Sequence, residues 1–147
     1  MKISIITFCI IIGLSSCQGE DAKIAKAAND TANYTSIQWI DSVKNIGYVT
    51  AGAKTEIKFR FKNTGTKPLF IIAAHPGCGC TVADYPKEAI APNARGVITA
   101  DYAAQKGTQG EFRKNISVTA NTKGTTYHNI FFYGEIKKEG DGTTVKK

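Results

Sequence analysis

The sequence predicts an all-β domain, folded as an antiparallel sandwich of about seven strands. Apolar and polar residues alternate with a period of two in several segments after residue 35, and such segments recur about every ten residues. Turn residues separate these segments, and no helix of useful length is indicated between them. With 147 residues, of which 42% are hydrophobic, the chain has room for one such domain and a targeting segment.

Residues 1–16 are predicted to be a signal peptide of the lipoprotein type. Lys2 supplies a charged start, and the apolar run 3–12 is too short for a membrane span, which needs about 20 residues. The run ends at Leu14-Ser-Ser-Cys17, which resembles a bacterial lipobox. We therefore expect cleavage before Cys17 and lipid attachment to its thiol, which would hold the protein at a membrane. The alternative is an ordinary signal peptide that happens to end near a cysteine.

Residues 17–35 are small and polar, and we interpret them as a flexible tether between the lipid and the domain. Gln18 follows the predicted lipidated cysteine, a pattern that resembles sorting to the bacterial outer membrane. The expected location is therefore the periplasmic face of that membrane, and the acidic pair Glu20-Asp21 leaves surface display as an alternative. Residues 139–147 are charged and contain glycine, which favours a disordered tail.

The sandwich is expected to occupy residues 36–138. Ile37 and Trp39 mark a first strand, and a short strand follows at Tyr48-Val49. The clearest alternation lies in 56–62, where three apolar side chains share one face and charged residues occupy the other. The apolar run 69–74 predicts a strand that is covered on both faces. The remaining inward positions are Ile98, Ala100, Tyr102, Phe112, Ile116, Val118, Ala120, Ile130, Phe132 and Ile136, and the series is interrupted by Lys114 at a bulge or an edge.

Two cysteines lie close together in the segment His75-Pro-Gly-Cys78-Gly-Cys80-Thr81. Four interpretations of Cys78 and Cys80 remain open. They form a structural disulfide, since exported chains meet oxidising chemistry. They act as a redox pair, because a bridge over one residue is strained and reducible. They bind copper(I) or zinc with His75 as a third ligand. Or they are small packing residues at the end of a strand.

Several short motifs resemble the domain-of-unknown-function family 1573, which is common among bacterial lipoproteins. The motifs are Phe59-Arg-Phe-Lys-Asn-Thr-Gly65, Pro68-Leu69 with Ile71, Cys78-Gly-Cys-Thr81, Pro92-Asn-Ala-Arg-Gly96 and Gly110-x-Phe112-x-Lys114. Asn93 stands where the family has the first glycine of a Pro-Gly-x-x-Gly turn. The resemblance covers residues 46–136 and implies an immunoglobulin-like sandwich, similar to domains of pilus chaperones and of ciliary and sperm-protein modules. It implies no activity.

The sequence contains no pattern that indicates an enzyme. A Gly-x-Ser-x-Gly elbow, a phosphate-binding loop and a His-Glu-x-x-His motif are all lacking. The net charge is +7, but the cations are spread along the chain, which is unlike a nucleic-acid binder. We therefore expect a non-catalytic interaction or structural module without a cofactor, which binds another envelope protein. The alternative is a lipoprotein that handles thiols or a soft metal through Cys78 and Cys80.

Overall fold

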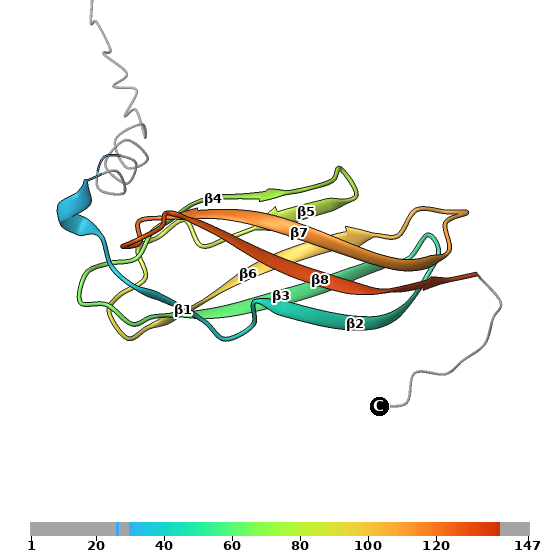
Figure 1. Ribbon diagram of the computed structural model, residues 1–147, viewed down its shortest axis with the longest axis horizontal. Helices are drawn as coiled ribbons and strands as arrows, with labels where there is room; N and C mark the ends of the chain where they lie inside the picture. Colours follow the sequence, from blue (N-terminus) through green and yellow to red (C-terminus); the bar gives the residue numbers. More distant parts are fainter. Residues whose placement is uncertain (1–25, 27–29, 139–147) are drawn as a thin grey trace, which may run out of the picture.

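The computed structural model describes Lys26 and residues 30–138, and this part of the chain folds as a sandwich of two four-stranded sheets (Figure 1). The predicted signal peptide, Cys17 and the predicted tail 139–147 lie outside the described residues. One sheet has the strand order β1-β3-β6-β5, and the other has the order β2-β8-β7-β4. The elements are a 3-10 helix η1 (Thr31–Asn33) and the strands β1 (Ile37–Trp39), β2 (Val43–Thr50), β3 (Lys54–Asn63), β4 (Ile71–Pro76), β5 (Thr81–Asp84), β6 (Arg95–Ala103), β7 (Gly110–Ala120) and β8 (Tyr127–Lys137).

The predicted all-β sandwich is confirmed, and its core follows from the alternation of β3. Ile57, Phe59 and Phe61 are buried, while the charged residues between them face outward. Burial of each phenylalanine is worth roughly 1.5–3 kcal/mol. β6 pairs with β3 from Lys54↔Ala103 to Lys62↔Arg95 and contributes its own alternate residues to the same interior. The facing sheet supplies the residues Ile116, Val118, Ala120, Ile130, Phe132 and Ile136.

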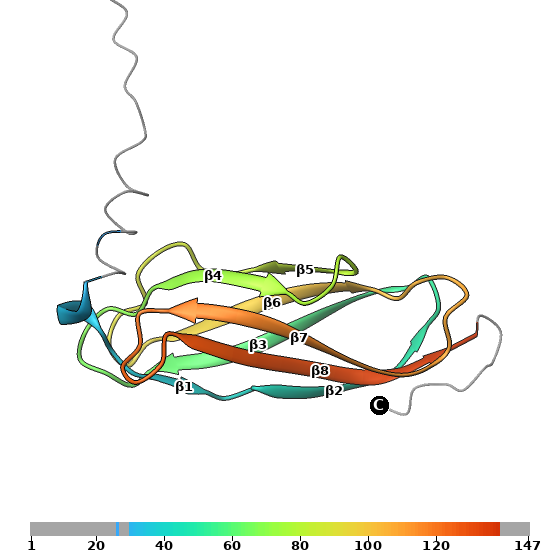
Figure 2. The same cartoon turned by 45° about the horizontal axis from the view of Figure 1, so that its top comes forward.

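The chain crosses from one sheet to the other on both long sides of the sandwich. On one side, β1 is an edge strand of the first sheet, and the chain passes through residues 40–42 into β2, an edge strand of the second. On the opposite side, β4 ends the second sheet and β5 ends the first, and the turn 77–80 joins them. Figure 2 shows this β4/β5 side turned toward the viewer. The cysteine pair therefore lies where the chain changes sheets.

The strand inventory differs from the prediction in two places. Eight strands are present rather than about seven, because β5 forms in a region that we expected to be mostly irregular on account of Pro86 and Pro92. In addition, β2 pairs with β8 in parallel, although an antiparallel arrangement was expected. The parallel pair results from the sheet crossing after β1, which brings β2 alongside β8 in the same direction.

Lys114 occupies an edge position rather than a bulge. The register of β7 with β8 runs through Lys114↔Phe132 without a shift, whereas the pairing of β4 with β7 ends at Pro76↔Ile116. At Lys114, therefore, β7 has a partner on one side only. This position is compatible with a cation on a face that is otherwise apolar, because the side chain reaches the open end of the sandwich.

Two buried asparagines fasten the loops at the other end of the sandwich. Asn63 donates to the carbonyls of Lys67 and Ile90 and accepts from the Thr35 hydroxyl. Asn121 donates to the carbonyls of Asn33 and Pro68 and accepts from the amide of Phe70. Both side chains are fully buried. Residues 31–35, which we assigned to the tether, thus contact the sandwich directly. Within the described residues, no helix is long and apolar enough to cross a membrane.

Candidate functional site at the disulfide turn and the β5 edge

The turn that joins β4 to β5 is fixed to β7 at its first residue. The amide of Gly77 donates to the carbonyl of Asn115 at 2.9 Å. A Cβ atom at position 77 would overlap the end of the Asn115 side chain, so a larger residue here would displace that side chain. The turn therefore starts from a defined position on the neighbouring strand, which sets the direction in which the two cysteines leave β4.

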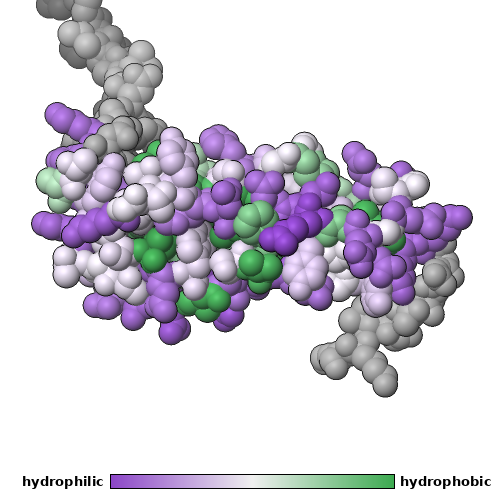
Figure 3. Space-filling model, in the orientation of Figure 1, coloured by the Kyte–Doolittle hydropathy of each residue, from purple (hydrophilic) through white to green (hydrophobic). Residues whose placement is uncertain are grey.

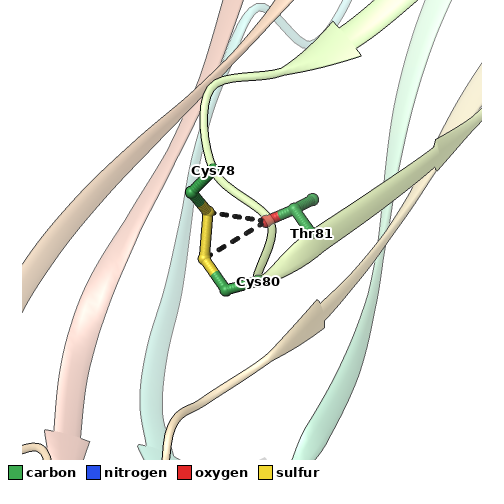
Figure 4. Close-up of a disulfide and its surroundings, with 3 residues drawn as sticks. All are labelled: Cys78, Cys80 and Thr81. Atoms are coloured by element: carbon green, nitrogen blue, oxygen red, sulfur yellow. Dashed lines mark hydrogen bonds between the residues drawn. A yellow bond between two sulfur atoms is a disulfide. The ribbon is translucent and has the colours of Figure 1, made fainter.

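Cys78 and Cys80 form a disulfide in the structure, with their Cα atoms 5.3 Å apart (Figure 4). This spacing is within the usual range for bridged cysteines, which is about 4.4–6.8 Å. The hydroxyl of Thr81 lies 3.6 Å from the sulfur of Cys78 and 4.0 Å from that of Cys80. The amide of Thr81 donates to the carbonyl of Cys78 at 3.3 Å. The buried Thr81 is the first residue of β5, so these contacts connect the disulfide to the start of that strand.

The structure does not gather His75 with the two cysteines into a metal site. His75 is an exposed residue of β4 whose backbone is opposite Ser117. Among the residues from 30 to 138, no three His, Cys, Asp or Glu side chains are placed to hold a metal ion. The structure thus brings together two of the three residues that were candidates for a soft-metal site.

The disulfide borders a groove of about 600 Å³ at the open end of the sandwich. Tyr102, Phe112 and Lys114 also line it. The rings of Tyr102 and Phe112 stack with their centroids 4.9 Å apart, and burial raises the pKa of the Tyr102 phenol. Because Cys78 and Cys80 are only half-buried, an external thiol has access to the disulfide from this groove.

The backbone of β5 has hydrogen-bonding groups on its free side. The carbonyl of Cys80 accepts from the amide of Ala103 on β6. In an antiparallel ladder, residues whose backbone groups bond to the partner strand alternate with residues whose backbone groups point away from it. The backbones of Val82 and Asp84 therefore face β6, and those of Thr81 and Ala83 face away. The Thr81 amide is already bonded within the turn. The N–H and C=O of Ala83 and the C=O of Thr81 therefore point to the side where no described strand is paired.

The neighbouring edge of β4 is protected, in contrast to β5. The amide of Gly77 bonds to β7. Because residues that face the partner strand alternate with residues that face away, the backbone groups of Ala74 and Pro76 point to the free side of β4. Pro76 has no N–H to offer, and proline on an edge strand is a common device against strand pairing. The hydroxyl of Tyr85 donates to the carbonyl of Ile72 at 3.1 Å, so another acceptor of β4 is occupied.

The edge strand β5 was not predicted from the sequence. The signal was the alternation in Thr81-Val-Ala-Asp84, where the side chains of Thr81 and Ala83 turn inward and that of Val82 is 69% exposed. Four residues are too few to stand out between a glycine-rich turn and two prolines. The free side of a strand is also a property of sheet order, which one strand's sequence does not contain.

A comparison with known families connects this geometry to a defined group of proteins. Residues 37–136 match the family of proteins of unknown function DUF1573. The chain belongs to DUF1573. The predicted family membership is therefore confirmed. No match was found among curated proteins.

Solved structures similar to this DUF1573 chain support the sandwich fold. A protein of unknown function from Porphyromonas gingivalis W83 matches with a TM-score of 0.61 and 14% identity, over 72% of this chain and 49% of the other. A family 123 glycoside hydrolase from Clostridium perfringens matches with a TM-score of 0.54 and 9% identity, over 67% of this chain and 23% of the enzyme. This chain thus spans about half the length of the Porphyromonas protein. At these identities the likeness shows the fold alone.

Proposed function

We propose that this DUF1573 chain is a lipid-tethered, non-catalytic binding module of the cell envelope, which binds a strand of another envelope protein at β5. The proposal rests on three backbone groups of an edge strand that point away from β6, namely the N–H and C=O of Ala83 and the C=O of Thr81. A partner strand placed there would extend the order β1-β3-β6-β5 by one, with main-chain hydrogen bonds providing affinity.

The other edges are less suited to strand addition. β1 and β2 belong to one segment that bends between the sheets, and β2 has an irregularity in its pairing between Asn45 and Tyr48. Bulges of this kind twist an edge away from an incoming strand. β4 is protected by Pro76 and by the hydroxyl of Tyr85. On β5, in contrast, Val82 adds an exposed apolar side chain that a partner would cover.

In this proposal, the disulfide has a structural role. It holds the turn whose last backbone bond, from Thr81 to Cys78, sets the start of β5. The second candidate function, thiol handling, is supported by the half-buried disulfide beside the groove. Replacing both cysteines by serine distinguishes the two functions. If the bridge only supports the turn, the variant still binds its partner. If the thiols carry the function, the variant loses that function although its melting temperature is unchanged.

The strand-addition proposal is tested with a photo-crosslinking amino acid at position 82 of the full-length chain in its source cells. We expect a protein adduct from position 82 and none from position 58, an exposed position on the outer face of β3 in the middle of the same sheet. Ala83→Pro removes the free N–H without touching the ladder to β6 and should abolish the adduct. Ala83→Ser, the matched control, should retain it. An adduct that persists with proline at position 83 would contradict strand addition.

The membrane tether is tested separately. Cys17→Ala removes the thiol that would take the lipid, so the protein should remain unprocessed and the lipid-dependent membrane fraction should disappear. Fractionation of the membranes, followed by immunoblotting, reports the location of the wild type. Processing and membrane association that are unchanged by Cys17→Ala would exclude the lipoprotein assignment, and recovery from the inner membrane would exclude the outer-membrane assignment.

A further inference from the structure

The two outward faces of the sandwich differ in chemistry. The outer face of the β1-β3-β6-β5 sheet carries the charged row of β3, which consists of Lys54, Glu56, Lys58, Arg60 and Lys62. The outer face of the β2-β8-β7-β4 sheet carries aromatic side chains beside charged ones, and we call it the aromatic face; its residues include Tyr48, Phe131, Tyr133, Glu111, Arg113 and Glu135. Figure 3 shows hydrophobic side chains scattered among hydrophilic ones over β7 and β8.

A groove of about 670 Å³ lies on the aromatic face, at the end where β2, β8 and β7 run side by side. This volume is within the range of small-ligand sites, about 300–1,000 Å³. The strand register arranges its side chains in two rows across the sheet. The rows are Asn45–Tyr133–Arg113 and Tyr48–Glu135–Glu111.

Two glycines shape this groove. Gly47 has a φ of 70°, a left-handed conformation that favours glycine, and it lies where the β2–β8 register shifts. A Cβ atom on Gly134 would overlap the backbone carbonyl of Gly47 and approach the ring of Phe112 to 3.2 Å. β2 therefore approaches β8 closely at this point, and the floor of the groove is made of backbone and one aromatic ring. Side chains at 47 or 134 would change this shape.

Two tyrosine rings of the groove are exposed, and a cation holds one of them. Tyr48 is 54% exposed and Tyr133 is 40% exposed. The Nζ atom of Lys137 lies 3.6 Å from the centroid of the Tyr48 ring, and the guanidinium carbon of Arg113 lies 4.6 Å from that of Phe131. The Lys137 contact restricts the Tyr48 ring and covers one of its faces, so a ligand that stacks on the other face loses less side-chain entropy on binding.

The polar groups of the groove are mostly acceptors. Glu111 and Glu135 are directly opposite each other, an arrangement of like charges that costs stability. Neither forms an ion pair with a described residue. Their carboxylates are available to accept hydrogen bonds, while Arg113 donates and the Asn45 amide can do both. Two carboxylates repel an anionic ligand, so the groove suits an uncharged molecule with many hydroxyl groups.

We propose that this groove binds an uncharged saccharide. The C–H faces of a sugar ring stack on the exposed faces of Tyr48 and Tyr133, and neighbouring sugar hydroxyls donate to Glu111 and Glu135. A peptide strand would instead seek unpaired backbone groups at a sheet edge. Here the walls are side chains that project from paired strands. The site is on a different face from the β5 edge, so it does not depend on strand addition.

The test uses the purified full chain against a panel of uncharged saccharides, namely soluble glucan, mannan, xylan and N-acetylglucosamine oligosaccharides. Affinity electrophoresis identifies a binder, and titration calorimetry gives the dissociation constant. Tyr133→Ala and Tyr48→Ala should each weaken binding about tenfold or more, whereas Tyr133→Phe, which keeps the ring, should stay within about threefold. Tyr127→Ala is the matched control, because Tyr127 is 72% exposed on the same strand but outside the groove. Circular dichroism verifies that each variant is folded.

Three results would overturn the proposal. The first is that no saccharide of the panel binds at millimolar concentration. The second is that binding occurs but is equal in wild type, Tyr133→Ala and Tyr48→Ala, which would place the ligand elsewhere. The third is that a crosslinker at position 133 captures a protein in cells and the saccharide does not compete with it. Ala83→Pro should leave saccharide binding unchanged, so failure of one proposal is distinguishable from failure of the other.

Discussion

Asn121 shows how one side chain can secure several loops. Its amide joins the N-terminal segment at Asn33 to Pro68 and Phe70 of the β3–β4 connection through three hydrogen bonds of 2.7–3.0 Å. Asn121 is fully buried, so its removal takes the hydrogen-bond partner from three backbone groups that are only partly accessible to water.

We therefore expect Asn121→Ala to lower the free energy of unfolding by about 2–4 kcal/mol, since it removes three hydrogen bonds that are each worth about 0.5–1.5 kcal/mol. Urea denaturation measures this change. Asn129→Ala, at an exposed position on β8, is the control and should change stability by less than about 0.5 kcal/mol. Equal effects of the two substitutions would show that the buried hydrogen bonds do not stabilise the fold.

Asp41 gives the domain a defined response to acid. Two hydrogen bonds from the Arg60 guanidinium, at 2.6 and 3.1 Å, are the main reason why the pKa of Asp41 is lowered from 3.8 to about 2. The folded state thus favours the carboxylate, and this stabilisation is complete above pH 3.8 and is lost as the pH falls toward 2.

Thermal melting between pH 5 and pH 2 tests the sign of this effect. The wild type should lose stability below about pH 4, and Asp41→Asn should lose less over the same interval because its side chain does not titrate. Other carboxylates contribute to both curves, so the difference between them isolates Asp41. Parallel curves would rule out the ion pair as a source of acid sensitivity.

At the scale of the elements, the disulfide closes a very small ring, because its cysteines are two residues apart. The loss of unfolded-state entropy depends on loop length, and for so short a loop the stabilisation is at most about 1–2 kcal/mol.

Replacing both Cys78 and Cys80 by serine should therefore lower the free energy of unfolding by no more than about 2 kcal/mol. Urea denaturation of this variant, compared with the wild type with and without a reductant, provides the measurement. The reduced wild type should match the serine variant. A loss well above this value would mean that the bridge orders more of the β4/β5 side than its own turn.

The sequence predicted those elements whose pattern is complete within a single strand. The alternation around Phe59 and the inward residues of β8 were correct, because burial on one face of a strand imposes a period of two. The parallel pairing of β2 with β8 was not predictable in this way, since strand direction within a sheet depends on where the chain crosses. The same holds for the groove, whose residues come together only through the register of three strands.

At the scale of the whole molecule, the disulfide was visible from the sequence, whereas the two surface sites were not. Cys78 and Cys80 are neighbours in the chain, so the possibility of a bridge was visible from the spacing. The free side of β5 depends on sheet order, and the chemistry of the aromatic face depends on which strand lies beside which. The family match at residues 37–136 indicated the fold and left both surfaces without an assigned role.

The five connections that cross between the two sheets also determine how the domain should unfold. Each connects strands that lie on opposite sides of the core. Separating the two layers would therefore pull on the connections β1–β2 and β4–β5 and disrupt the strands at both ends of them. Neither layer can survive as a half-folded intermediate, and the transition should be all-or-none, with equal calorimetric and van't Hoff enthalpies. A domain with this property exposes no loose layer to proteases while it remains native.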